Sequence, residues 1–180
     1  MKRALKQILG FFEENTVLVQ FYALIGLFFI AFYALLQWKI SHELIATRLP
    51  VLMAENVAWG LRMVGVEDAI ATGRSVSMPN FSFQLIYHCA GIFGMGIYGA
   101  AVMAYPSRWW ETLIGFAIGL PGLYVINTIR MVALGLIGMH WPTMFDWFHE
   151  WMWQGIFIIF VIVFWMIWKE KFVRYEPNSR

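Results

Sequence analysis

Four long apolar segments alternate with shorter polar stretches along the chain. They occupy residues 16–38, about 89–107, about 112–134 and about 150–168. Each reaches or approaches the roughly 20 residues that a helix needs to cross the hydrocarbon core of a bilayer. The pattern therefore predicts an all-α integral membrane protein, with about four transmembrane helices in a single domain that covers residues 1–180.

The first apolar segment follows a basic start, MKRALK, which is also how a signal peptide begins. Residues 16–38 are, however, well beyond the roughly 7–15 apolar residues of a signal peptide. No small-residue cleavage site follows them. We therefore expect a retained first span.

The segment between the first two spans, residues 39–88, has a different pattern. SHELIATRLPVLMAENVAWGLRMVG places apolar residues at helical spacing with charges between them, which predicts one or two amphipathic helices on the membrane surface, interrupted near Pro50. VEDAIATGRSVSMPNFSFQLIY then predicts short strands around turns at Gly73 and at residues 79–80.

Composition supports a membrane protein and excludes some other classes. Hydrophobic residues make up 61% of the chain and charged residues 13%, whereas soluble domains average about 25% charged residues. The net charge of +2 comes without a basic cluster, so nucleic acid is not an expected partner. The single cysteine excludes an internal disulfide.

Lysine and arginine placement predicts the orientation of the spans. With four spans, three groups of basic residues fall on one side: Lys2, Arg3 and Lys6 at the start, Arg108 in the turn YPSRWWE, and Lys169, Lys171, Arg174 and Arg180 at the end. We expect that side, with both termini, to be cytoplasmic, in a multi-pass protein of the cell inner membrane. The segment 39–88 is then extracytoplasmic.

Three reactive side chains fall at one predicted depth. Cys89 lies 19 residues before the arginine that follows its span, Arg130 lies 19 residues after the glutamate near the start of its span, and His149 lies 20 residues before the first lysine of the tail. At a rise of about 1.5 Å per residue these separations are roughly 28–30 Å, the thickness of the hydrocarbon core. All three residues are therefore predicted at the extracytoplasmic mouth of the helices.

Each residue also has an ordinary explanation. A cysteine in a membrane helix serves as a small apolar side chain, an arginine near a helix end extends to the interface, and a histidine at the start of a span is interfacial. The coincidence of all three favours a site for acyl transfer. Cys89, predicted to open its helix, would be the nucleophile, Arg130 would stabilise the thiolate or an oxyanion, and His149 would carry the proton.

Two further residues are expected to support this chemistry. Asn127 lies three residues before Arg130, on the same helical face, where it could orient the guanidinium or donate a second hydrogen bond. Gly91, with Ala90, would leave room for a peptide backbone to approach the sulfur. His88 is adjacent to Cys89, so its side chain should point elsewhere, and no metal or cofactor is expected in this reading.

A non-enzymatic class stays open on the residues alone. His88 and His149 at one depth could ligate a haem in a membrane anchor, or the chain could be a transporter or a structural subunit. Tolerance of substitutions at the cysteine, arginine and histidine would be typical of a structural subunit.

Three segments also resemble the signature regions of the exosortase/archaeosortase family. They are HCAGI at 88–92, PGLYVINTIRMVAL at 121–134 and FHEWMWQGIFI at 148–158, in the family's order, and the resemblance covers about residues 70–168. It implies a membrane cysteine protease and transpeptidase, with Cys89 as nucleophile, Arg130 as transition-state stabiliser and His149 as proton donor and acceptor. The implied partners are membrane lipid, exported proteins with a PEP-CTERM-like C-terminal sorting motif, helix and basic tail, and an unknown acceptor nucleophile.

Overall fold

The computed structural model describes residues 43–86 and 89–173, together with positions 26, 27, 30, 31, 33, 34 and 38. The six described positions between 26 and 34 are helical and exposed. Most of the first predicted span, 16–38, lies outside the described residues, as do His88 and both ends of the chain.

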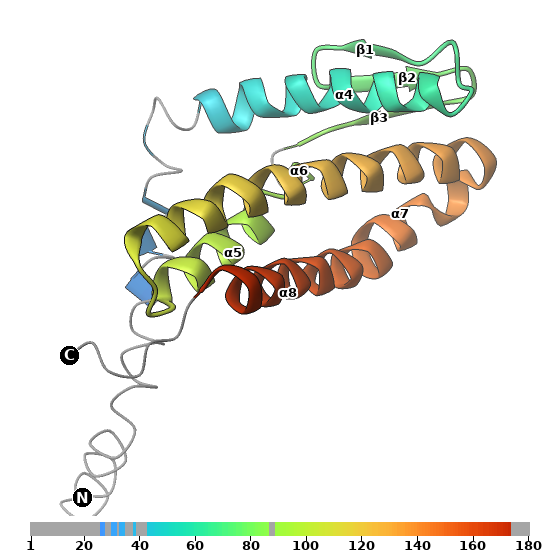
Figure 1. The fold of residues 1–180 in the computed structure, drawn as a ribbon. Helices are drawn as coiled ribbons and strands as arrows, with labels where there is room; N and C mark the ends of the chain where they lie inside the picture. The colour runs from blue at the N-terminus through green and yellow to red at the C-terminus, as the bar shows by residue number, and fades with distance from the viewer. Residues whose placement is uncertain are drawn as a thin grey trace, which may run out of the picture.

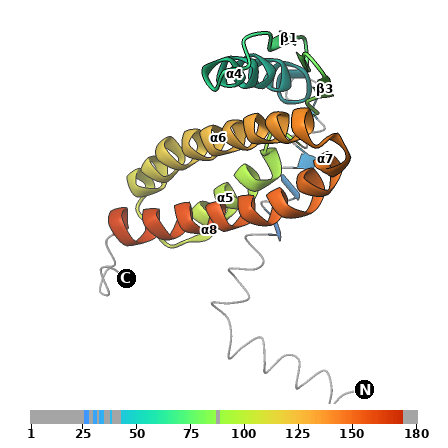
Figure 2. The ribbon, with the colours of Figure 1, turned by 90° about the vertical axis from the view of Figure 1, so that its right-hand side faces the viewer.

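Three helices form the body of the described chain. They are α5 (Ile92–Ala104), α6 (Trp109–His140) and α8 (Trp153–Phe172), and each packs against the other two. Figure 2 shows α5 and α8 on one side of α6. The second, third and fourth apolar segments are thus confirmed as helices, although their bounds differ from those expected.

The helix α6 is the clearest membrane span in the described part of the chain. It has 32 residues and is apolar enough to cross a bilayer by itself. The helix α5 is apolar but has only 13 residues, because it begins at Ile92 rather than at Cys89. Before α8 come the short helical turns η2 (Pro142–Met144), α7 (Phe145–Trp147) and η3 (Phe148–Met152), and the two parts of this region are bent by about 40°.

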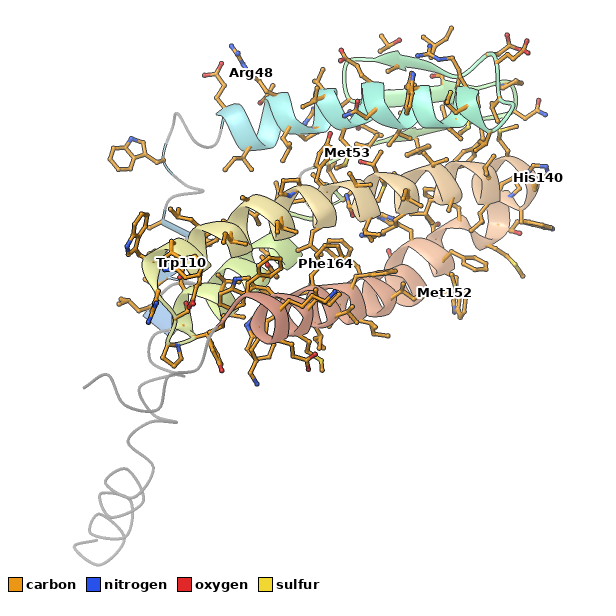
Figure 3. All side chains as sticks on the ribbon, viewed as in Figure 1. Arg48, Met53, Trp110, His140, Met152 and Phe164 are labelled. Atoms are coloured by element: carbon orange, nitrogen blue, oxygen red, sulfur yellow. The ribbon has the colours of Figure 1, made fainter. Side chains whose placement is uncertain are left out.

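The length of α6 has a physical consequence. At about 1.5 Å per residue it is roughly 48 Å long, whereas the hydrocarbon core is about 30 Å thick. One end must therefore project beyond the core. Trp110 and His140 lie near its opposite ends (Figure 3), and a three-stranded sheet packs at the His140 end. The helix was expected to stop at residue 134, but it continues beside this sheet to His140.

The sheet is formed by the predicted strands. It has the order β1 (Ile70–Thr72), β2 (Ser75–Met78) and β3 (Phe81–Gln84), all antiparallel. The turns fall at Gly73, which has φ +59°, and at residues 79–80. The sequence reading of two turns and short strands is confirmed.

The predicted amphipathic segment contains the helix α4 (Leu49–Met63). This helix continues without a break from the π-helical turn η1 (Leu44–Arg48), and Pro50 is its second residue. The helical stretch therefore changes from π-helical to α-helical turns near Pro50 but is not broken there. The helix α4 runs alongside α6 and packs against the sheet (Figure 1).

Two hydrophobic cores follow from this arrangement. One joins α4 and the sheet to the C-terminal half of α6 and includes Met53, Leu61 and Leu134. The other lies between α5, α6 and α8 and includes Phe164, which is labelled in Figure 3. Phe164 packs over Gly122, and the indole Nε1 of Trp168 donates a 2.7 Å hydrogen bond to the carbonyl of Glu111. The candidate site lies where the two cores meet.

Candidate active site

The three predicted catalytic residues come together in the structure. The Sγ atom of Cys89 lies 3.4 Å from Nε2 of His149, although the residues are 60 positions apart. Both line one pocket of about 340 Å³ with Arg130. Its other described lining residues are Ile86, Gly91, Phe93, Gly94, Ile97, Glu150, Phe157 and Ile158.

Cys89 is held in a turn rather than at a helix start. Its backbone N–H donates a 2.9 Å hydrogen bond to the carbonyl of Ile86, and α5 begins only at Ile92. Gly91 precedes the helix with φ +72°, a left-handed conformation that glycine adopts without strain. The expectation that Cys89 opens the helix is therefore wrong, because this turn separates the thiol from the helix N-terminus by two residues.

Gly91 is required by packing as well as by backbone conformation. A Cβ atom there would lie 3.0 Å from Cγ of Asn127 and 3.1 Å from Cζ of Phe157. Ala90 is fully buried and is not among the lining residues of the pocket. Gly91 therefore lines the pocket beside the sulfur, whereas Ala90 is part of the hydrophobic core.

Asn127 connects the cysteine backbone to the arginine. Its Nδ2 donates a 2.8 Å hydrogen bond to the carbonyl of Cys89 and also lies 3.3 Å from Sδ of Met53. Its Oδ1 accepts a 3.3 Å hydrogen bond from Nη1 of Arg130. The i, i+3 spacing on α6 brings the two polar side chains to one face, as predicted.

Arg130 is a buried cation with few partners. Its side chain is 8% exposed, and its guanidinium carbon lies 6.0 Å from the ring centroid of Phe157. Its Nε atom has no hydrogen-bond partner among the described residues. No carboxylate in the described part of the chain forms an ion pair with the Arg130 guanidinium. Because an unpaired buried charge is costly, this guanidinium is suited to an anion that forms or binds beside it.

His149 lies in η3, the wide helical turn that precedes α8. Its Nδ1 atom is buried and has no hydrogen-bond partner among the described residues. A proton on Nδ1 would leave Nε2 free to accept the thiol proton of Cys89. Nothing in the described part of the chain orients the ring through Nδ1, as a carboxylate does in many catalytic triads.

The electrostatic setting of the cysteine is mixed. Cys89 is 7% exposed, and this burial raises the pKa of its thiol above the ordinary value, while the backbone at Ile86 and the charge of Arg130 act in the opposite direction. Burial therefore favours the protonated thiol, next to the nitrogen that can accept its proton.

Three contributors to the site were not predicted. Met53 of α4, Phe157 of α8 and Phe145 each contact one of the polar residues. Only Phe145 has a sequence signal, since it lies four residues before His149 and hence on the same helical face. Met53 and Phe157 belong to other helices, and no motif in the sequence connects them to the site.

The remaining histidines are either distant or outside the described residues. The Nδ1 atom of His140 lies 2.9 Å from the carbonyl of Leu136, and its ring packs on Trp141. His88 lies outside the described residues, so the haem-ligand pair His88 and His149 is not tested. Within the described residues no group of three or more histidine, cysteine or acidic side chains could hold a metal ion.

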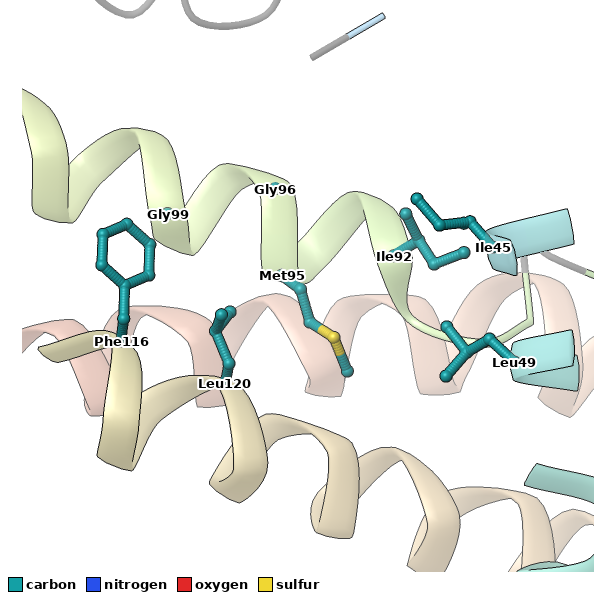
Figure 4. Close-up of a pocket in the computed structure, with 8 residues that line it drawn as sticks. All are labelled: Ile45, Leu49, Ile92, Met95, Gly96, Gly99, Phe116 and Leu120. Atoms are coloured by element: carbon teal, nitrogen blue, oxygen red, sulfur yellow. The ribbon is translucent and has the colours of Figure 1, made fainter. Parts of the chain in front are cut away.

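A second pocket, of about 290 Å³, lies between the start of α4, α5 and α6. Figure 4 shows its lining, which is apolar throughout: Ile45, Leu49, Ile92, Met95, Gly96, Gly99, Phe116 and Leu120. It has no reactive side chain, so the chemistry of the described chain is concentrated in the Cys89 pocket.

The fold and this pocket define a mostly helical membrane protein with a thiol, an imidazole and a guanidinium at one site. The chain belongs to the transmembrane exosortase family (Exosortase_EpsH), whose family model matches residues 16–169. This confirms the resemblance found in the sequence. No curated protein and no solved structure matches the chain.

Proposed function

We propose that this protein is a membrane-embedded cysteine peptidase or transpeptidase that cleaves C-terminal sorting signals of exported proteins. The observation that carries the proposal is the 3.4 Å contact between Sγ of Cys89 and Nε2 of His149, in a pocket that also contains the buried cation Arg130. A nucleophile within reach of a base is the arrangement that covalent catalysis requires.

The first step is attack on the scissile carbonyl. The S–H bond of Cys89 breaks, its proton moves to Nε2 of His149, and the sulfur forms a bond to the carbonyl carbon. The carbonyl oxygen becomes an oxyanion, which the guanidinium of Arg130 stabilises. Asn127 keeps one Nη1 hydrogen bond occupied, so that the rest of the guanidinium can face the substrate.

The second step releases the tail and resolves the thioester. The C–N bond breaks as His149 returns its proton to the leaving amine, and a thioester with Cys89 remains. A water molecule or an acceptor amine then attacks the thioester, loses its proton to His149, and restores the thiol. Water gives hydrolysis and an amine gives transpeptidation.

The proposal includes a topology. Four spans with both termini in the cytoplasm, as the distribution of lysine and arginine favours, would place the pocket at the extracytoplasmic face of the inner membrane. The substrate's C-terminal helix would lie in the bilayer with its basic tail in the cytoplasm. Its sorting motif would then reach Cys89 from the outer side.

The catalytic proposal is tested with a reporter that carries a C-terminal motif, helix and basic tail taken from an exported protein of the same genome. Cys89→Ala and His149→Ala should each leave the reporter unprocessed, while the enzyme is present in the membrane at normal abundance. His140→Ala serves as the histidine control, because this exposed residue lies near the end of α6, and it should process normally. Normal processing by Cys89→Ala would refute the proposal.

The topology is tested with single cysteines in a Cys89→Ala background, which has no other thiol. The exposed positions Asn80, in the β2–β3 turn, and Trp109, at the start of α6, are each changed to cysteine. A membrane-impermeant maleimide should label Asn80→Cys in intact cells and Trp109→Cys only after permeabilisation. The reverse pattern would invert the proposed orientation.

A further inference from the structure

The imidazole of His149 is stacked on a phenyl ring. Its ring centroid lies 5.8 Å from that of Phe145, with an angle of only 8° between the ring planes. This is the offset parallel arrangement that aromatic pairs favour. Nε2 of the ring lies 3.4 Å from Sγ of Cys89, whereas Nδ1 has no hydrogen-bond partner among the described residues. The stack on Phe145 therefore restrains the ring plane where a hydrogen bond at Nδ1 would otherwise do so.

Phe145 is itself held by the sheet. Its ring centroid lies 5.0 Å from that of Phe81 and 5.8 Å from that of Phe83, both on β3. Phe81 in turn packs over Gly138 of α6, where a side chain would collide with its ring. The four rings therefore form one continuous aromatic cluster from β3 to His149.

The same strand also leads to the nucleophile, because Cys89 follows the last residue of β3, Gln84, by five positions. One small sheet is thus connected to both reacting groups, to Cys89 through the chain and to His149 through the aromatic cluster. A shift of the ring plane would change the direction in which Nε2 faces the sulfur.

We propose that Phe145 is a positioning residue for His149, which holds the imidazole by stacking in place of the hydrogen-bonded carboxylate of other cysteine and serine enzymes. The inference rests on the proposed function, in which Nε2 of His149 accepts the thiol proton of Cys89. Without the stack the imidazole turns about its side-chain bonds and the contact with the sulfur is lost. Misplacement of a catalytic group by about 1 Å can cost on the order of 100-fold in rate.

Phe145 also packs against the hydrophobic core that joins α4 and the sheet to α6, so a purely structural role has to be separated from positioning. Phe148 offers a matched control, because it packs against the same core and meets Trp147 edge-on, with an angle of 86° between the ring planes. A leucine at either position removes a ring of the same size from the same core. Only the change at Phe145 removes the stack on the imidazole.

The experiment measures the rate at which iodoacetamide alkylates Cys89 in the full-length protein in membranes at pH 8. Alkylation joins the sulfur to the reagent's carbon, expels iodide and passes the thiol proton to His149. We expect Phe145→Leu to lower this rate about 10-fold, a part of the 10²–10⁴-fold that a positioned base supplies. Phe145→Tyr and Phe148→Leu should react within about 2-fold of the unchanged protein.

The decisive comparison repeats Phe145→Leu in a His149→Ala background. If Phe145 acts through the imidazole, Phe145→Leu should not lower the alkylation rate further in this background. The effects of two substitutions are not additive when one residue acts through the other. An equal loss in both backgrounds, or no loss in the unchanged background, would overturn the proposal.

Reporter processing keeps this inference separate from the proposed function. If Cys89→Ala abolishes processing while Phe145→Leu leaves alkylation and processing unchanged, only the positioning role is refuted. If Cys89→Ala still processes the reporter, the peptidase proposal is refuted, whatever the alkylation rates show.

Discussion

Asn127 donates a 2.8 Å hydrogen bond from Nδ2 to the backbone carbonyl of Cys89, across 38 residues of sequence. The same amide accepts a hydrogen bond from Arg130 through Oδ1. One fully buried side chain therefore sets the position of the cysteine backbone relative to the guanidinium. The N-x-x-R pattern at 127–130 has its physical explanation in this double contact.

Asn127→Ala should reduce both activity and stability. It leaves the Cys89 carbonyl and one Arg130 donor without a partner, and an unsatisfied buried group costs about 1–3 kcal/mol. We expect reporter processing to fall at least about 10-fold, as expected when a catalytic group is misplaced. Thr128→Ala is the control, since it removes only a local bond from Oγ1 to the Tyr124 carbonyl. Equal behaviour of the two variants in processing and thermal unfolding would contradict this account.

Arg130→Lys tests whether the guanidinium is needed or only a positive charge. A lysine keeps the charge but cannot bond Asn127 and also offer further donors in a fixed plane. We expect processing to fall about 10-fold in Arg130→Lys and about 100-fold or more in Arg130→Ala, the range found when an oxyanion donor is removed. The measure is the initial rate of reporter cleavage at equal enzyme abundance.

Arg62→Lys provides the control for that series. Arg62 is exposed and donates a long 3.5 Å hydrogen bond to the Ala69 carbonyl, so its replacement should leave processing unchanged. If Arg130→Lys also cleaves at the normal rate, a positive charge alone is sufficient. The proposed need for the planar guanidinium is then refuted.

The fixed rise of a helix explains how much of the site could be predicted from the sequence. A helix has a fixed rise, so residue counts from the charged ends placed Cys89, Arg130 and His149 at one level without any knowledge of packing. The structure brings these three residues to one pocket. What counting cannot supply is direction around the helix axis, and therefore which atoms meet.

The parts that were missed depend on contacts between distant segments. Hydropathy ends the third span near residue 134, but α6 continues to His140 because α4 and the sheet cover its last turns. The helix start at Ile92 is set by the positive φ of Gly91, which no apolar pattern records. Met53 enters the site because α4 packs on α6, a tertiary choice that its own amphipathic pattern leaves undetermined.

Gly91→Ala should damage the site beyond its effect on the backbone. A non-glycine residue with positive φ costs about 1–2 kcal/mol, and here the added Cβ also meets Asn127 at 3.0 Å. Either Asn127 or the turn that holds Cys89 has to move, so we expect processing to fall at least about 10-fold. Thermal unfolding and reporter cleavage are measured on the same preparation.

Gly73→Ala is the matched control for that variant. Gly73 also has positive φ, at +59°, but nothing lies within 4 Å of an added Cβ. It should show the backbone cost in thermal unfolding with normal processing. Loss of processing in Gly73→Ala as large as in Gly91→Ala would show that backbone strain alone, and not contact with Asn127, explains the effect.

Alkylation of the resting enzyme should depend steeply on pH. Burial raises the pKa of the Cys89 thiol, and the charge of Arg130 offsets this only in part. Because the protonated form is the one that burial favours, the reactive thiolate is scarce at neutral pH and increases with pH. We expect the iodoacetamide rate to rise through about pH 8.5, the ordinary pKa of cysteine, without a plateau below it. Cys89 is the single thiol of the chain, so the measurement has no competing site.

Arg130→Gln tests the direction in which Arg130 shifts the pKa of the Cys89 thiol. Removing the cation removes an influence that lowers the pKa of the Cys89 thiol, so the pH–rate curve should move to higher pH and the rate at pH 8 should fall. A guanidinium that acted only on the substrate would leave the curve of the free enzyme in place. A rate that is already constant between about pH 6.5 and 8.5 in the unchanged protein would instead reveal a preformed thiolate–imidazolium pair, and the proton transfer proposed for substrate attack would then have taken place before the substrate binds.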